Sequence, residues 1–401
     1  MQEARQMQPL AGPVASGFGI ALMPASPGAW QQADMAFPPI SLGAPGSLRR
    51  VVPPARLGLH RLPLYCGMAY DLTDKLVIGI SSRALFDLEH ENGIYQSEGV
   101  ASYSAYQRQH EDEPLLPGTA FPLVQALLEL NHLIPDRRLV EVVVISRNSP
   151  DTGLRAFNAI ETHRLDITRA AFTGGEPISR YLQAFKVDLF LSREASDVQA
   201  AIDGGVAAAQ LYAAPADYHA PAGQIRIAFD GDAVLFSPES EQIFKQKGLE
   251  AFTRHEQKHR HKAMAEGPFA KLLLRLAEIQ AHFEPGQCPV RIAIVTARNS
   301  PAHTRVVHTL RAWNVSIDEA FFLGGLPKDQ VLQAFGAHMF FDDQEGHVEL
   351  ASAVVPSGRV PYKGGELGGG KRRTAARKRV TNPQADAPPG HTPESAASSV
   401  K

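Results

Sequence analysis

Four groups of polar residues follow apolar runs in the second half of the chain. Asp230-Gly231-Asp232 comes directly after IRIAF, Thr296 follows VRIAIV, Lys328 opens an expected helix, and Asp342-Asp343 follows HMFF. Apolar runs of this length are typical of buried strands. Because ligands bind at the carboxyl ends of the strands in open α/β sheets, we expect these groups to surround one site.

These residue types suit hydrolysis of a phosphate monoester. Asp230 can attack phosphorus and form an aspartyl-phosphate, which divides one slow reaction into two easier steps. Asp232 can protonate the leaving oxygen and then activate water. The Thr296 hydroxyl and the Lys328 ammonium can hold the phosphoryl oxygens. The neighbouring residues predicted to contact the substrate are Gly231, Ala297, Arg298 and Asn299.

A divalent cation would bring the phosphate dianion and the carboxylates together. Mg²⁺ prefers oxygen ligands and keeps several waters. Asp230, Asp342 and the backbone carbonyl of Asp232 are the predicted ligands, so Mg²⁺ is the predicted cofactor.

Composition and charge exclude several classes of protein. Lysine and arginine number 40 against 42 acidic residues, so the overall charge predicts neither a nucleic-acid nor a membrane partner. Only two cysteines are present, which suits a reducing compartment. No stretch of 18 apolar residues occurs, and we expect a cytoplasmic protein. Residues 1–67 and the basic tail 356–401 have compositions that predict disorder.

Between these ends, short apolar runs alternate with amphipathic ones, which predicts an α/β fold with parallel sheets. The chain also repeats itself: residues 76 onward align with 225 onward at an offset of 149, and later strings such as FTGGEP and FLGGLP match with small slips. We therefore expect two tandem Rossmann-like units at 68–215 and 216–355. A helical cap is expected at about 237–289 of the second.

The first copy lacks every chemical group of the second. In the alignment, the counterparts of Asp230, Asp232, Thr296, Lys328, Asp342 and Asp343 are Ser81, Arg83, Ile145, Ile178, Ser192 and Arg193. The scaffold around these positions is retained. This contrast predicts that the first unit is catalytically silent, although it could still bind a ligand.

The four motifs in this order resemble those of the haloacid dehalogenase (HAD) phosphatases. Longer strings resemble the cytosolic 5′-nucleotidase I family from about residue 70 to 363, among them VIGISSRALFDLE, RIAFDGDAVLFSPESE and MFFDDQEGHV. The resemblance implies HAD-like units and hydrolysis of AMP-like nucleoside 5′-monophosphates with Mg²⁺ at the second unit, with Asp343 completing the metal site. It also leads us to expect a nucleotide effector and a homo-oligomer.

Three other interpretations stay open at this point. The substrate could be another phosphometabolite, or the chain could be a non-enzymatic nucleotide sensor. His255-Glu256-Gln257-Lys258-His259 also matches HExxH, in which two histidines bind zinc and the glutamate activates water. Within the expected cap, Phe252, His255 and Phe269 are candidates for contact with the base, although packing of the cap explains each of them more simply.

Overall fold

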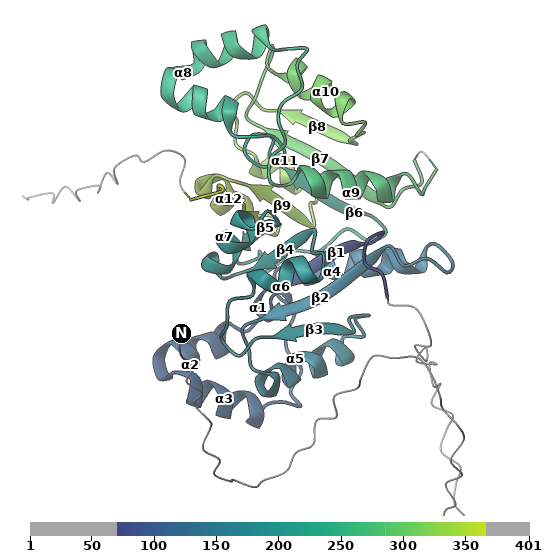
Figure 1. The fold of residues 1–401 in the computed structure, drawn as a ribbon, viewed down its shortest axis with the longest axis vertical. Coiled ribbons are helices and arrows are strands. Elements are labelled where there is room, and N and C mark those ends of the chain that lie inside the picture. The colour runs from purple at the N-terminus through teal and green to yellow at the C-terminus, as the bar shows by residue number, and fades with distance from the viewer. Residues whose placement is uncertain (1–69, 285, 366–401) are drawn as a thin grey trace, which may run out of the picture. The chain divides into compact units, whose positions relative to one another are not determined.

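The computed structural model describes residues 70–284 and 286–365 (Figure 1). They form one mostly parallel sheet of ten strands with twelve α-helices among the described residues, which confirms the predicted α/β class. The strands are β1 Leu76–Ile80, β2 Val140–Ser146, β3 Arg169–Phe172, β4 Leu189–Ser192, β5 Ala207–Leu211, β6 Ile225–Phe229, β7 Val290–Thr296, β8 Glu319–Phe322, β9 Met339–Asp342 and β10 Ser357–Arg359.

The helices lie mainly between successive strands, as parallel connections require. They are α1 Ser82–Leu85, α2 Glu89–Glu98, α3 Val100–Gln109, α4 Phe121–Glu129, α5 Pro150–Thr162, α6 Ser179–Ala184, α7 Ala195–Asp203, α8 Glu239–Lys258, α9 Ala270–Gln280, α10 His303–Ala312, α11 Asp329–Phe335 and α12 Glu345–Ser352, with a 3₁₀ turn at Leu130–His132.

The strand order repeats about the middle of the sheet. The order is β3-β2-β1-β4-β5-β10-β9-β6-β7-β8. From each edge to the middle, the third, second, first, fourth and fifth strands of a set therefore follow one another, with β1–β5 as the first set and β6–β10 as the second. Within each set of five, neighbouring strands are parallel, and β5 and β10 join the sets as an antiparallel pair. The carboxyl ends of the strands in the first set therefore lie on the opposite side of the sheet from those in the second set, as measured along the strand direction.

Strand register corrects one pair in the sequence alignment. β2 pairs with β1 from Val140, and β7 pairs with β6 from Val290, so Ser146 and Thr296 are both the last residues of their strands. The counterpart of Thr296 is therefore Ser146 and not Ile145. The sequence alignment had matched the identical letters RNSP at 147–150 and 298–301, which are shifted by one residue relative to the strand register.

A glycine interrupts the helix that follows the first strand of each set. Gly99 separates α2 from α3 with φ 87° and ψ −175°, and Gly248 kinks α8 with φ 79° and ψ −178°. Glycine adopts positive φ without the steric cost that a Cβ brings. Aligned residues thus take the same unusual conformation.

Strand β10 corrects the predicted start of the C-terminal tail at residue 356. The letters SGR carry no apolar run, yet their backbone bonds to β5 on one side and β9 on the other. A Cβ at Gly358 would lie 2.9 Å from Ala209 Cβ and 3.0 Å from Leu211 Cδ2, so the strand fits only with glycine there. The extension 1–67 and the basic residues after 365 lie outside the described residues.

The predicted cap at about 237–289 is shorter in the structure than the sequence suggested. Helix α9 buries Leu272, Leu273 and Leu276 in the main core and packs on β7. It is a crossover helix of the sheet, so only α8 of the segment 237–289 can act as a cap. In the part of the chain that the structure describes, no helix is long and apolar enough to cross a membrane.

The buried His338 leads to a prediction about acid stability. Its Nδ1 accepts the Arg226 amide proton at 3.2 Å, and burial, with the nearby Arg226 charge, lowers the pKa of His338 to about 4. The unfolded chain takes up this proton near pH 6.5, so folding stability is lost as the pH falls from 6.5 toward 4. The loss amounts to about 3 kcal/mol at most. In His338→Gln, which retains an acceptor, the free energy of unfolding should fall less between pH 7.5 and 4.5.

Urea titrations at the two pH values measure this difference. The exposed His132→Gln serves as the matched control and should respond to acid as the wild type does. Equal acid sensitivity in all three proteins would contradict the assignment.

Candidate active site

The structure brings Asp230, Lys328 and Asp342 into contact at the carboxyl edge of the second set of strands. Asp230 follows β6, Asp342 ends β9, and Lys328 precedes α11. The Lys328 ammonium lies 2.5 Å from Asp230 Oδ1 and 2.6 Å from Asp342 Oδ2. All three side chains are buried.

This buried cluster has more negative than positive charge. Burial raises the pKa of Asp230 to about 7. The Lys328 charge lowers this pKa, and the charges of Asp342 and Asp232 offset part of that lowering. Burial and the charges of Asp230 and Asp342 raise the pKa of Asp343 to about 9. Burial opposes the charged form of Lys328, but the two aspartates hold its pKa above the usual value. The raised pKa values of Asp230 and Asp343 show that one ammonium does not hold all three carboxyls ionised, so a further cation would favour their charged forms.

The carboxylates meet a geometric requirement for such a cation. One oxygen each from Asp230, Asp342 and Asp343 lies within 4.8 Å of the others. Asp343 Oδ1 is buried without a hydrogen-bond partner among the described residues. An all-oxygen set of this kind fits a hard dication such as Mg²⁺.

Asp232 points to a different partner. Arg298 Nε and Nη2 each donate to one Asp232 carboxylate oxygen at 2.7 Å, and Arg298 Nη1 donates to Glu256 at 2.5 Å. Burial would lower the pKa of Arg298, but both carboxylates raise it above its usual value. Arg298 was predicted to contact the substrate. In this structure it holds Asp232 in one orientation through a bidentate pair.

The other predicted phosphate contacts line the same loop. Thr296 is buried, and its Oγ1 accepts the Arg298 amide proton at 3.3 Å. A Cβ at Gly231 would lie 3.5 Å from Thr296 Oγ1, which places the nucleophile loop beside that hydroxyl. Ala297 and Asn299 are exposed. The loop therefore alternates buried residues, Thr296 and Arg298, with residues exposed to solvent.

Tyr362 belongs to the site although the sequence gave no signal for it. It follows β10, and its hydroxyl donates to Asp343 Oδ2 and lies 3.1 Å from a Glu241 oxygen on α8. Burial and the charge of Asp343 raise the pKa of the phenol. His347 Nδ1 also lies 3.2 Å from Asp342 Oδ2. The contact between residues 343 and 362 depends on β10, which no periodicity indicated.

Replacing Tyr362 with phenylalanine should weaken metal use. The hydroxyl holds Asp343, and loss of a group that orients a ligand typically costs about 10- to 100-fold in metal affinity. We expect the Mg²⁺ concentration for half-maximal phosphate release to rise about tenfold, with little change in kcat at saturating metal.

Tyr218→Phe is the matched control, because that hydroxyl donates to the Ala337 carbonyl at 2.9 Å outside the acidic cluster. A Tyr362→Phe enzyme with the metal requirement of Tyr218→Phe would show that Tyr362 has no such role.

The HExxH match does not form a zinc site. Glu256 is buried between Arg298 and Arg305, at 2.5 and 2.9 Å, so it is not free to activate water. His255 Nε2 lies 3.2 Å from Arg305 Nη1. Among the described residues, the group of three potential ligands that lie close together is the acidic one. The peptidase interpretation is therefore wrong for this geometry.

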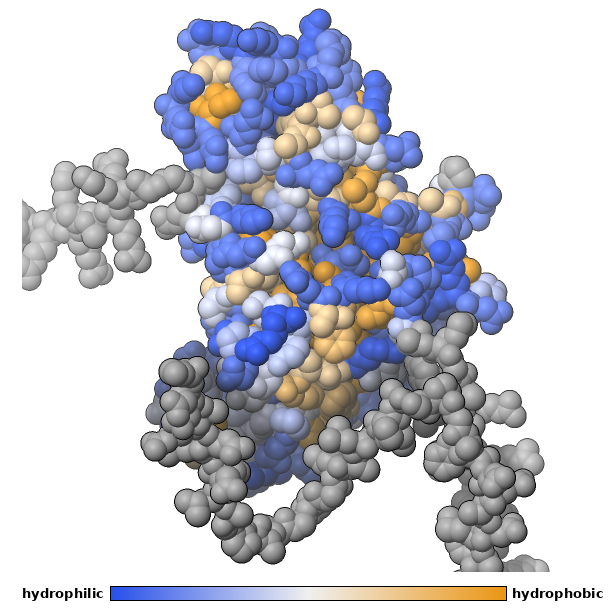
Figure 2. All heavy atoms as spheres, in the orientation of Figure 1, coloured by the Kyte–Doolittle hydropathy of each residue, from blue (hydrophilic) through white to orange (hydrophobic). Residues whose placement is uncertain are grey.

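The candidates for base contact separate into two kinds. Phe269 is fully buried and packs on Phe229 and Phe341, so it is a core residue. Phe252 lies on α8 with its ring 5.4 Å from the Arg298 guanidinium. Beside it, Phe244 is exposed, and Figure 2 shows apolar surface on α8 within a hydrophilic region.

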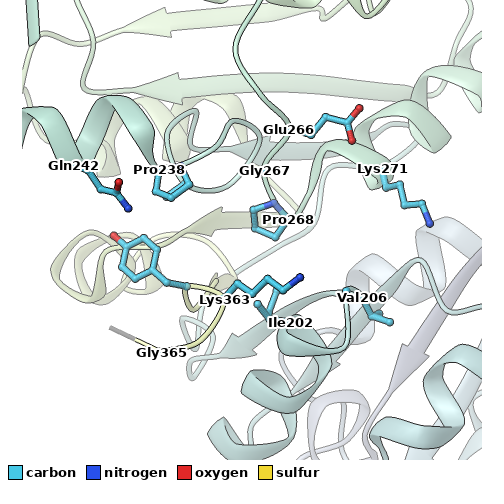
Figure 3. Close-up of a pocket in the computed structure, with 13 residues that line it drawn as sticks. Ile202, Val206, Pro238, Gln242, Glu266, Gly267, Pro268, Lys271, Lys363 and Gly365 are labelled. Atoms are coloured by element: carbon cyan, nitrogen blue, oxygen red, sulfur yellow. The ribbon is translucent and has the colours of Figure 1, made fainter. Parts of the chain in front are cut away.

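A cavity of about 560 Å³ is lined by residues of both halves of the chain (Figure 3). Tyr362 connects it to the acidic cluster, because its side chain lines the cavity while its hydroxyl reaches Asp343. The lining is mixed: Ile202, Val206, Pro238 and Pro268 are apolar, and Gln242, Glu266, Lys271 and Lys363 are polar. None of the predicted catalytic side chains lines it.

A family model of 5′-nucleotidases matches residues 68–366. This chain belongs to the 5′-nucleotidase family. Human cytosolic 5′-nucleotidase 1B is 38% identical over 289 residues, which cover 70% of this chain and 47% of the human protein. This member of the 5′-nucleotidase family thus spans about half the length of that curated relative.

Likenesses to solved structures are weak. A Pnkp1/Rnl/Hen1 complex gives a TM-score of 0.27 at 9% identity and covers 72% of this chain and 96% of that one. Histidinol dehydrogenase from Elizabethkingia anophelis gives 0.21 at 11% identity, with coverage of 72% and 53%. Scores this low have no bearing on the fold of this chain.

Proposed function

We propose that this protein is a Mg²⁺-dependent 5′-nucleotidase that hydrolyses AMP-like nucleoside monophosphates through an aspartyl-phosphate. The observation that carries the proposal is the buried contact of Lys328 with Asp230 and Asp342, next to the unsatisfied oxygen of Asp343. Family membership supports the same reaction class. The repeated strand order supports two HAD-like units, the first without catalytic residues and the second with α8 as its cap.

In the proposed mechanism, each side chain has one task. Asp230 attacks phosphorus, and Lys328, Thr296 and the backbone of the 296–299 loop hold the phosphoryl oxygens. Asp232 serves as acid toward the leaving oxygen and then as base toward water. Both of its oxygens accept from Arg298 in this structure, so Asp232 must leave that pair and take up a proton before it can donate one. Mg²⁺, bound by Asp230, Asp342, Asp343 and the Asp232 carbonyl, would supply charge neutralisation for the dianionic substrate.

We place the nucleoside in the cavity beside Tyr362. Its volume of about 560 Å³ lies in the range of small-ligand sites, and its mixture of apolar and polar walls suits a base and a ribose. We also propose that the protein is cytoplasmic and a homo-oligomer, and that a nucleotide acts as an effector.

A phosphate-release assay on the purified protein tests the proposal. AMP, other nucleoside monophosphates and sugar phosphates are compared with Mg²⁺ and with EDTA. We expect release from nucleoside monophosphates, lost in EDTA and restored by excess Mg²⁺. Faster release from sugar phosphates would favour another phosphometabolite, and AMP binding without release would favour a nucleotide sensor.

A further inference from the structure

The first set of strands has a polar site at the position that the acidic cluster occupies in the second. The amide of Ser81 bonds to the Leu191 carbonyl at 2.9 Å, as the amide of Asp230 bonds to the Phe341 carbonyl at 2.8 Å. Ser81 therefore has the backbone position of the proposed nucleophile. Because β5 and β10 are antiparallel, this first site lies at the opposite edge of the sheet.

The charge at the two positions is inverted. The second site has aspartates at 230, 232, 342 and 343, and the corresponding residues of the first are Ser81, Arg83, Ser192 and Arg193. Four carboxylates are thus replaced by two guanidiniums and two hydroxyls, a change from −4 to +2 in formal charge. None of these four side chains is a carboxylate that could bind a divalent cation, and their charge suits an anion directly.

Two guanidiniums, one from α1 and one from the residue after β4, converge on one oxygen. Arg83 Nη2 lies 2.9 Å and Arg193 Nε 3.3 Å from Glu89 Oε1. Their side chains are 27% and 21% exposed, and that of Glu89 is 44% exposed. The arginines are thus held in place, while the carboxylate that joins them is the accessible partner.

Polar groups at this site also have unused bonding capacity. Arg83 Nε and Ser81 Oγ are buried and have no hydrogen-bond partner among the described residues. Ser82 Oγ lies 3.0 Å from Ser146 Oγ, the counterpart of Thr296. Buried polar atoms without a partner are costly, so they point to a ligand that completes them.

We propose that Arg83, Arg193 and Ser81 form a second binding site, which takes the phosphate group of a nucleotide without a metal ion and without hydrolysis. The ligand phosphate displaces Glu89 from the two guanidiniums. No carboxylate at positions 81 or 192 is available to attack phosphorus, so the ligand is released unchanged.

A nucleoside phosphate fits better than free phosphate because aromatic rings lie nearby. The Tyr103 hydroxyl donates to Asn148 Oδ1 at 3.2 Å, and the Asn148 amide lies 3.5 Å from Ser82 Oγ. Tyr95 is half exposed and packs edge-on against Tyr103, with 5.9 Å between ring centres. Phe244 and Phe252 have the same arrangement on α8, at 6.2 Å.

Isothermal titration with AMP in EDTA tests this inference on the full-length protein. The acidic site needs a metal to accept a phosphate, so binding in EDTA reports the first site. We expect Arg83→Gln and Arg193→Gln each to weaken binding by about tenfold or more. Glu89→Gln removes the competing carboxylate and should strengthen binding by about threefold. The opposite signs distinguish a binding role from damage to the fold.

Two control variants complete the experiment. Arg180→Gln removes an exposed arginine of the same half, and Thr296→Val alters the other site; both should bind AMP in EDTA as the wild type does. Absence of binding in EDTA, or binding that Thr296→Val reduces and the Arg83 and Arg193 variants do not, would overturn the inference. Binding in EDTA without phosphate release in Mg²⁺ would contradict only the proposed function.

Discussion

Replacing Asp230 with asparagine should reduce phosphate release from AMP by at least about 10⁴-fold, because the amide cannot form the covalent intermediate. The fold should survive the change. Lys328 still contacts Asp342 at 2.6 Å, and the asparagine occupies the same volume. Single-turnover and steady-state assays with saturating Mg²⁺ measure the loss.

The matched control is Asp217→Asn, which removes an exposed carboxylate from the same half. Its turnover should equal that of the wild type, and the thermal unfolding of both variants should be close to it. Substantial turnover by well-folded Asp230→Asn would exclude Asp230 as the nucleophile and would favour direct attack by water.

Much of this fold is predictable because its strands are buried on both faces. Runs such as LVIGI and VEVVVIS leave few alternatives to central parallel strands, and the residues after them then share an edge of the sheet. That is why Asp230 and Asp342 could be expected at one edge of the sheet, where the structure places both in contact with Lys328. Lys328 itself is not at a strand end but directly before α11.

Other features depend on pairings that single residues do not reveal. Strand β10 is three residues long and has no apolar run, so the sequence SGR does not predict a strand. The contact between Tyr362 and Asp343, which depends on this strand, could not be predicted either. Likewise, Arg298 was predicted to contact the substrate, with a structural role in the turn after the strand as the simpler alternative. Its partners Asp232 and Glu256 come from segments 66 and 42 residues away, which only the folded chain defines.

The repeat shows how a buried charge constrains both halves. Arg155 pairs with Glu91 at 2.7 Å and with Gln107 at 3.1 Å. Its counterpart Arg305 pairs with Glu256, which is the counterpart of Gln107. A buried arginine without a carboxylate would be strongly destabilising, so each half retains one acid although its position differs. In the second half the same acid also contacts Arg298, which links this structural pair to the proposed acid/base residue.

Replacing Lys328 with glutamine should lower kcat by about 10²- to 10³-fold, the usual effect of removing one group that stabilises the transition state. The ammonium also contacts two of the three candidate metal ligands. Without its positive charge, those carboxylates should attract a dication more strongly. We therefore expect a lower Mg²⁺ requirement together with a much lower kcat, which titration of activity against Mg²⁺ resolves.

This divergence separates a chemical role for Lys328 from a purely structural one. A structural role predicts that kcat and metal affinity fall together, because a loosened site loses both. The Lys328→Gln variant also removes the charge that opposes protonation of Asp230, so the pKa of that carboxyl should rise further. Since the nucleophile must be ionised, the acid limb of the variant's pH–rate profile should move to higher pH at limiting Mg²⁺, where no bound cation holds Asp230 ionised. The exposed Lys247→Gln, which should alter neither quantity, gives the baseline against which both shifts are read.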